Sequence, residues 1–190
     1  AMVLPDGRTI EVSLVDAATP AVFVRADALG YKGTELPSDI ESNPKGLLDV
    51  LEIIRRKAAV MMGLAATEEL ASPAVPKVCM IASPQTYVTS DGKTIEAANI
   101  DVVARTKALK VIHKAYAVTG GICTATAALL EGTVVNEVVS NRAKETKTVV
   151  LGHPSGTFSF TIDVTHEGTE YILHKAGVAR TARPIMDGVA

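Results

Sequence analysis

The sequence has no tryptophan, and aromatic residues make up only 4% of its 190 residues. Hydrophobic residues still account for 47%, so the core must consist mainly of Val, Ile, Leu, Ala and Met side chains. Cysteine is also scarce, because only Cys79 and Cys123 are present, and both have apolar neighbours in the sequence. Neither belongs to a CxxC or Cys/His spacing, which argues against a zinc site. We interpret both cysteines as buried thiols.

An excess of charge of either sign is missing as well. The 19 Lys and Arg residues oppose 21 Asp and Glu residues, and the net charge is −2. This balance lacks the basic footprint of a nucleic-acid-binding protein. No apolar run has the length of a membrane span, and no charged-then-apolar leader opens the chain. We expect a cytoplasmic protein without nucleic-acid or membrane partners. The abrupt start close to an apolar strand also suggests a piece of a longer protein.

Residues 1–190 show no repeat, low-complexity tract or linker, so a single α+β domain fits best. Alternation and short apolar runs predict strands at Thr9–Asp16, Ala21–Ala26, Lys77–Ser83, Tyr87–Thr89, Thr133–Val139, Thr148–Leu151, Thr157–Thr165, Glu170–Ala176 and Ala179–Met186. Helical periodicity predicts helices at Asn43–Met62, Ala97–Leu109 and Thr119–Glu131, and a charged, hairpin-like loop is predicted at Asn141–Lys147. The Asn43–Met62 helix has an apolar stripe, so it is expected to cover one face of a sheet.

The stretch Ala115–Glu131 is the predicted centre of the domain. Small apolar residues follow Thr119-Gly120-Gly121, which suits a helix that is packed on all sides. Thr119 is the predicted N-cap, and the two glycines would let the backbone turn sharply into the first turn. A buried helix that opens in this way offers a seat for a carboxylate or phosphate. The alternative is a tight strand-to-helix turn without a ligand.

A second candidate site is the sequence GHPSG at Gly152–Gly156, which lies between two strand-like segments. His153 can exchange a proton near neutral pH, while Ser155 and the amides around Gly156 can bind an oxyanion or a carboxylate. No Lys follows the second glycine, so this is not a Walker phosphate loop. The alternative is a proline-glycine turn in which His153 caps a carbonyl.

The remaining polar residues form weaker patterns. Lys77 precedes a buried strand and either extends outward or serves a site. Arg180 and Arg183 could hold carboxylates, but they also suit an exposed terminal strand. The other histidines have no metal-ligand spacing, and the chain has no Gly-x-Ser-x-Gly elbow for a nucleophile. We therefore expect no metal site.

Five stretches together resemble the PrpF family of methylaconitate and methylitaconate isomerases and their tautomerase relatives: SLVDAATPAVFVRADALGYKGTELP, SPAVPKV, TGGICTATAA, GHPSG and RTARPIMDG. The resemblance covers nearly the whole chain. It implies the diaminopimelate-epimerase-like fold, in which two domains each wrap a mostly antiparallel sheet around a central helix and bind substrate between them. The chain is similar to the second half only. The family's acid/base pair, a Lys and a Cys, belongs to the first half, so neither Lys77 nor Cys123 takes those roles.

Two positions depart from the pattern that the resemblance implies. Thr19 precedes Pro20 where relatives tend to have Asn, which bears on substrate preference. Val118 stands where related epimerases have a catalytic Cys, which fits an isomerase that does not use this half for its thiol.

The resemblance predicts the C-terminal domain of a cofactor-independent isomerase that moves a double bond in an unsaturated di- or tricarboxylate. The isolated chain would be inactive, because it lacks its N-terminal domain. Its expected partners are a small carboxylate substrate, that N-terminal domain and further copies in a homo-oligomer. The alternative is a non-catalytic carboxylate-binding or assembly module. The residues expected to bind substrate are Thr119, Gly120, Gly121, His153, Ser155 and Gly156, and we expect both of their loops to open on the same edge of the domain.

Overall fold

The computed structural model describes residues 1–41, 46–168, 170–179, 186 and 188. The strands are β1 (Met2–Val3), β2 (Thr9–Ile10), β3 (Val12–Asp16), β4 (Pro20–Arg25), β5 (Lys77–Ala82), β6 (Tyr87–Val88), β7 (Thr94–Ile95), β8 (Val102–Ala108), β9 (Val111–Ile112), β10 (Thr148–His153), β11 (Gly156–Glu167) and β12 (Glu170–Val178). The helices are α1 (Pro37–Glu41), α2 (Leu47–Met61), α3 (Val118–Ala128), α4 (Val134–Val138) and α5 (Asn141–Thr146), with 3₁₀ turns η1 (Asp27–Leu29) and η2 (Ala97–Asn99).

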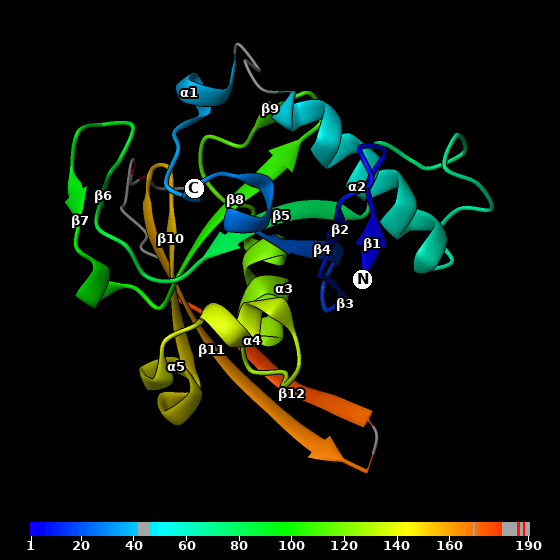
Figure 1. The fold of residues 1–190 in the computed structure, drawn as a ribbon. Coiled ribbons are helices and arrows are strands. Elements are labelled where there is room, and N and C mark those ends of the chain that lie inside the picture. Colours follow the sequence, from blue (N-terminus) through cyan, green and yellow to red (C-terminus); the bar gives the residue numbers. More distant parts are fainter. Residues whose placement is uncertain (42–45, 169, 180–185, 187, 189–190) are drawn as a thin grey trace.

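One large sheet organises the described chain (Figure 1). Its strand order is β12-β11-β10-β8-β5-β4-β3, and β9 pairs with the end of β8. Within the described residues its strand pairs are antiparallel, except for the parallel pairs β4–β5 and β8–β10. Two small hairpins, β1–β2 and β6–β7, lie outside this sheet. The predicted α+β class with a mostly antiparallel sheet is confirmed.

The sheet curls around α3, which lies at the centre of one core. This helix contacts β10, β11 and β12 on one side and β3 and β4 on the other. Its small side chains allow the strands to approach closely, and both Ala125 and Ala128 are 0% exposed. The predicted central, buried helix is therefore confirmed.

The opposite face of the sheet is covered by α2, as predicted for the amphipathic helix. Leu51 and Ile54 of α2 share a second core with Val22, Val24 and Met80. The described helix starts at Leu47, and the predicted start at Asn43-Pro44 lies outside the described residues. None of the helices in the described part of the chain is both long and apolar enough to cross a membrane.

The predicted helix at Ala97–Leu109 is wrong. The structure has the short turn η2 followed by the central strand β8. Almost every residue of β8 is buried, because both faces of the sheet are covered there. A strand buried on both faces loses its alternation, so its sequence resembles a buried helix.

Two predictions after α3 are also wrong. The predicted strand at Thr133–Val139 is the helix α4, and the predicted loop at Asn141–Lys147 is the helix α5. Each helix begins with a side-chain cap: Thr133 Oγ1 accepts from the Asn136 amide at 3.0 Å, and Ser140 Oγ accepts from the Ala143 amide at 3.2 Å. Such N-caps satisfy amides that a helix leaves unpaired, and they favour the helix over the β-propensity of valine.

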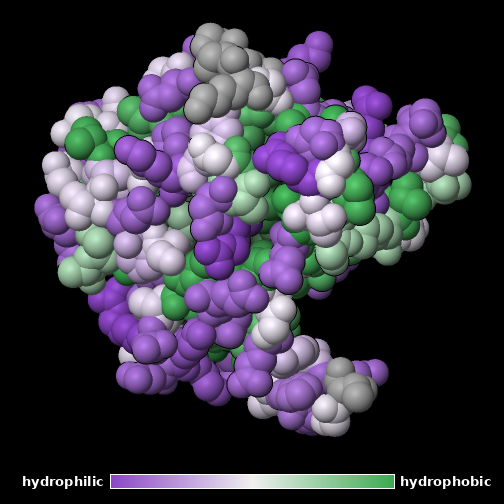
Figure 2. All heavy atoms as spheres, viewed as in Figure 1, coloured by the Kyte–Doolittle hydropathy of each residue, from purple (hydrophilic) through white to green (hydrophobic). Residues whose placement is uncertain are grey.

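The other predicted strands are present with small shifts of their bounds. The segment Thr9–Asp16 is divided into β2 and β3 at Glu11. The segment between η1 and α2 contains the short helix α1. The predicted strand Ala179–Met186, with Arg180 and Arg183, lies almost entirely outside the described residues. The outer part of the β11–β12 hairpin extends away from the body of the molecule (Figures 1 and 2).

Candidate functional site

Strand direction decides which loops meet at each end of the sheet. The parallel strands β4 and β5 begin at one end, with Ala21 opposite Lys77. At the same end, β8 finishes because it is antiparallel to β5, and the loop between β3 and β4, which contains Thr19, also lies there. β10 is parallel to β8, but its residues Leu151 and Gly152 pair with the start of β8, so His153 lies level with the finishing ends of β4 and β5. We call the region around His153, the last residue of β10, the His153 end.

The start of α3 lies near the His153 end, because the Ser155 hydroxyl donates to the Lys114 carbonyl just before the helix and Gly121 lies against Phe160 of β11. Cys123 in the first half of α3 contacts the Val15 carbonyl near the end of β3, at 3.4 Å from Sγ. Beyond the other end of the helix, the Val134 amide donates to Ser13 Oγ near the start of β3, at 2.9 Å. The helix therefore runs from the end of β3 toward its start, and the positive end of its dipole lies where the chain arrives from Lys114.

The helix begins one residue earlier than predicted. Its N-cap is Ala117, which has extended φ and ψ and gives no side-chain cap, so the prediction of Thr119 as the N-cap is wrong. Thr119 is exposed in the first turn. The first intrahelical bond runs from the Gly121 amide to the Ala117 carbonyl at 2.8 Å. The helix itself thus supplies no acceptor for the amides of Val118, Thr119 and Gly120.

The two glycines of α3 have different surroundings. A Cβ atom on Gly121 would lie 2.1 Å from Cζ of Phe160, whereas one on Gly120 would lie 3.5 Å from Cε1 of Tyr116. Both glycines are helical, and neither has a positive φ, so the expectation that they make a sharp turn is wrong. Gly121 instead permits the close approach of α3 to β11.

The GHPSG sequence forms the tight turn of the β10–β11 hairpin. His153 pairs with Gly156, and Pro154 and Ser155 make the two-residue loop. Ser155 is exposed, and its hydroxyl donates to the Lys114 carbonyl, in the segment that leads into α3. The structure thus brings the two candidate loops to one end of the domain. The binding of substrate by these residues stays a prediction.

His153 differs from the expectation that it exchanges a proton near neutral pH. Its side chain is 5% exposed, and its Nδ1 accepts from the Ser155 amide at 3.2 Å. Burial, together with the nearby charges of Arg105 and His113, lowers the pKa of His153 to about 4, although a hydrogen bond with the Thr157 backbone opposes this. The ring is therefore neutral at pH 7 and holds the turn in place.

The basic residues His113 and Lys114, which follow β9, lie close to the His153 end. Lys77 opens β5 at the end of the sheet where β4 also begins. Within the described residues, neither Lys77 nor Lys114 forms an ion pair with a carboxylate. The contact of Lys114 with Ser155 requires the tertiary structure, since 41 residues separate them.

The two thiols are buried and unpaired, as predicted. Cys79 lies 3.3 Å from Thr106 Oγ1, and burial raises its pKa. Burial also raises the pKa of Cys123 to about 12. Neither thiol can serve as an acid or base near neutral pH in this conformation. Among the described residues, no group of three or more His, Cys, Asp or Glu side chains could hold a metal ion.

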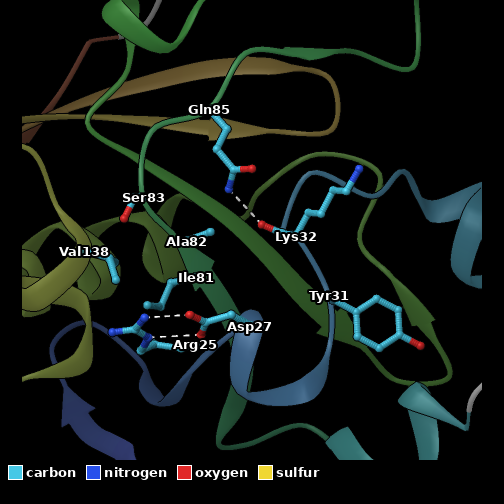
Figure 3. Close-up of a pocket in the computed structure, with 9 residues that line it drawn as sticks. All are labelled: Arg25, Asp27, Tyr31, Lys32, Ile81, Ala82, Ser83, Gln85 and Val138. Carbon is cyan, nitrogen blue, oxygen red and sulfur yellow. Dashed lines mark hydrogen bonds and ion pairs between the residues drawn. The ribbon is translucent and has the colours of Figure 1, made fainter.

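A cavity of about 290 Å³ lies where β4 and β5 finish (Figure 3). Two of the charged side chains there, Arg25 and Asp27, bind each other. Arg25 binds Asp27 through two bonds of 3.1 and 2.6 Å, and the Gln85 amide donates to the Lys32 carbonyl at 2.9 Å. No sequence motif marked this cavity, because its lining comes from four separate segments.

A larger groove of about 770 Å³ lies between α2 and the β8–β9 hairpin. Glu52 is its central charge and binds three cations: Arg55 at 2.6 Å, Lys107 at 2.7 Å and Arg56 at 3.1 Å. The hydrogen bond from Arg55 is the largest cause that lowers the pKa of Glu52 to about 2, and Lys107 and Arg56 add to it. This cluster joins α2 to β8 and has a structural role.

The fold and the paired loops at the His153 end define a domain of the diaminopimelate-epimerase-like class. The crystal structure of a methylitaconate-delta-isomerase superimposes with a TM-score of 0.78 at 36% identity, covering 94% of this chain and 50% of that chain. The family model described as PrpF protein matches residues 2–190. The chain belongs to the PrpF family, which confirms the resemblance seen in the sequence.

Curated relatives of the chain carry isomerase names. The chain is 42% identical to 3-methylitaconate isomerase of Eubacterium barkeri, over 94% of this chain and 47% of the relative. It is 36% identical to 2-methyl-aconitate isomerase of Shewanella oneidensis, over 93% of this chain and 44% of the relative. It is 32% identical to 2-methyl-aconitate isomerase of Cupriavidus necator, over 97% of this chain and 46% of the relative. The chain thus spans about half the length of the curated relatives it matches.

Proposed function

We propose that this chain is the C-terminal half of a two-domain isomerase that moves a double bond in an unsaturated di- or tricarboxylate. The observation that carries the proposal is family membership over residues 2–190, combined with coverage of about half of each named isomerase. The relatives' names indicate methylitaconate and 2-methylaconitate as the substrate class. The two loops at the His153 end support a role for this half in holding the substrate.

The reaction removes a proton from the carbon beside the double bond and returns a proton at the other end of the allylic system. Negative charge spreads onto a carboxylate in the transition state, so amide donors aimed at that carboxylate would lower the barrier. In this chain the amides at Val118–Gly120 can supply such donors at the positive end of α3. Because His153 is neutral, the proposed cation is Lys114, which stands between the two loops.

The acid/base pair is assigned to the other half. Cys79 and Cys123 are both fully buried, and burial raises the pKa of each thiol. Proton transfer from carbon needs a group within hydrogen-bond reach of substrate, with a pKa near the working pH. The two thiols of this chain meet neither condition. No metal or organic cofactor is part of the proposed reaction.

Calorimetry with methylitaconate, 2-methylaconitate and trans-aconitate tests the binding role. Gly120→Val should remove most of the affinity, because the larger side chain presses on Tyr116 and shifts the first turn of α3. Ser155→Ala should weaken binding by about 1 kcal/mol, the net worth of a neutral hydrogen bond, because its hydroxyl is already donated to Lys114. Ser83→Ala removes a hydroxyl outside the two loops, so it is the matched control and should bind normally. Normal binding by the first two variants would refute the shared site.

Activity separates the proposal from its alternative. The 190-residue chain should not interconvert these acids alone, and it should do so when joined to a complementary first half. Turnover at the full rate by the chain alone would refute the assignment of the acid/base pair to the other half. Binding without turnover in any combination would instead identify a carboxylate-binding or assembly module.

A further inference from the structure

Tyr87 in β6 touches both ends of the GHPSG turn. Its side chain is 5% exposed, and its hydroxyl lies 2.8 Å from the His153 carbonyl and 2.9 Å from the Gly156 carbonyl. These are the paired residues that flank the two-residue loop. A single hydroxyl proton is therefore shared between the two carbonyls that close the hairpin.

Neighbouring groups bind the other carbonyls of the turn. The Ser90 amide donates to the Pro154 carbonyl at 2.8 Å, and Nη1 of Arg105 lies 3.4 Å from the Gly152 carbonyl. The Arg105 guanidinium also lies 5.1 Å from the centre of the Tyr87 ring. The carbonyls of the turn thus have donors from the β6–β7 hairpin and from β8.

Gly152 explains why the tyrosine can come so close. A Cβ atom at Gly152 would lie 3.0 Å from the Tyr87 hydroxyl oxygen and 3.0 Å from Cδ1 of Ile100. That spacing is tighter than most real contacts, so a larger residue would push the ring away. The first glycine of GHPSG therefore serves the approach of Tyr87.

The remaining contacts of the turn lead toward α3. Ser155 donates its hydroxyl to the Lys114 carbonyl and its amide to Nδ1 of His153. A carbonyl oxygen carries partial negative charge and would repel a carboxylate that approached it. Engaging the carbonyls with Tyr87 and Ser90 therefore favours an anion beside Ser155 and the first turn of α3.

We propose that Tyr87 is a positioning residue for the carboxylate site: its hydroxyl fixes the conformation of the His153–Gly156 turn and thereby sets how Ser155 faces α3. This inference rests on the proposed function for its ligand. The claim that Tyr87 fixes the turn rests only on the contacts of Tyr87. The fixing of the turn and the binding of a carboxylate can therefore be tested separately.

The test compares Tyr87→Phe with Tyr116→Phe in the 190-residue chain. Tyr116 is a matched control, because it is 4% exposed and its hydroxyl bonds Thr124 Oγ1 at 2.9 Å, away from the turn. The first measurement is the NMR titration of His153, whose pKa is lowered by burial and by the charges of Arg105 and His113. Tyr87→Phe should loosen the turn, admit water and raise this pKa toward its ordinary value, while Tyr116→Phe should leave it unchanged.

The second measurement is the affinity for trans-aconitate, with thermal melting to show that both variants fold. Tyr87→Phe should bind about three- to tenfold more weakly than the parent chain, and Tyr116→Phe should bind like the parent. An unchanged His153 titration in Tyr87→Phe would overturn the inference, whatever the affinity. If the titration responds but the parent chain binds none of the acids, the fixing of the turn is upheld and the proposed function is refuted.

Discussion

Replacing Gly121 with alanine tests whether this glycine serves packing. An added Cβ would lie 2.1, 2.7 and 3.0 Å from three atoms of the Phe160 ring. Phe160 is 0% exposed, and its ring packs against Phe158 with the centroids 5.8 Å apart, so it has little room to move. The clash must therefore shift either α3 or β11 within a close-packed core.

The expected magnitude follows from two opposing effects. Overpacking a core by one methyl group costs about 1–3 kcal/mol, and overlaps this short belong at the upper end. Alanine gains about 1 kcal/mol over glycine inside a helix. Gly121→Ala should therefore lower the free energy of unfolding by about 1–2 kcal/mol. Its melting temperature should fall by roughly 2–8 °C for a chain of this size.

Gly120→Ala is the matched control one residue earlier. Its Cβ would meet Cε1 of Tyr116 at 3.5 Å, which is an ordinary contact, so the helix-propensity gain should remain. This variant should melt at the same temperature as the parent or up to about 4 °C higher. Denaturant and thermal unfolding of both variants, and of Gly121→Ala combined with Phe160→Leu, provide the measurement. The smaller Leu should relieve part of the clash. The double variant should therefore lose less unfolding free energy than the two single variants lose together. Equal stability of both alanine variants would refute the packing explanation.

Further predictions concern Glu52, Asp101 and the two cysteines. Glu52→Gln should lower the free energy of unfolding by about 2–3 kcal/mol at pH 7, because Lys107 stays buried without its carboxylate partner. In urea titrations, the difference in unfolding free energy between this variant and the parent chain should shrink as the pH falls from about 4.5 toward 2, because Glu52 becomes protonated in the parent. Asp101→Asn should cost about 3 kcal/mol in the same assay, because the fully buried carboxylate accepts the Val150 amide at 2.7 Å and pairs with Arg142. Cys79 and Cys123 should react with a thiol reagent only after unfolding, and rapid native labelling would contradict their burial.

The sequence by itself determined the features that depend on local pattern. Alternating residues marked the outer strands, and small apolar residues after Thr119 marked a helix that could be surrounded by strands. The GHPSG residues predicted a tight turn, because proline restricts φ and glycine tolerates positive φ, and both effects are local. The ordered family stretches also located the PrpF resemblance, since several weak motifs in one order are specific where each alone is not.

Only the tertiary structure decided the features that depend on distant neighbours. The strand β8 has no alternation because other elements cover both of its faces, and the capped helix α4 overrides the strand propensity of its valines. Gly121 is required by Phe160, which is 39 positions away in the chain, and no local rule reveals that contact. His153 has an ordinary sequence context, yet burial beside Arg105 makes it neutral. Desolvation and close packing are properties of the folded surroundings, so the chemistry of the candidate site could not be settled from its motifs.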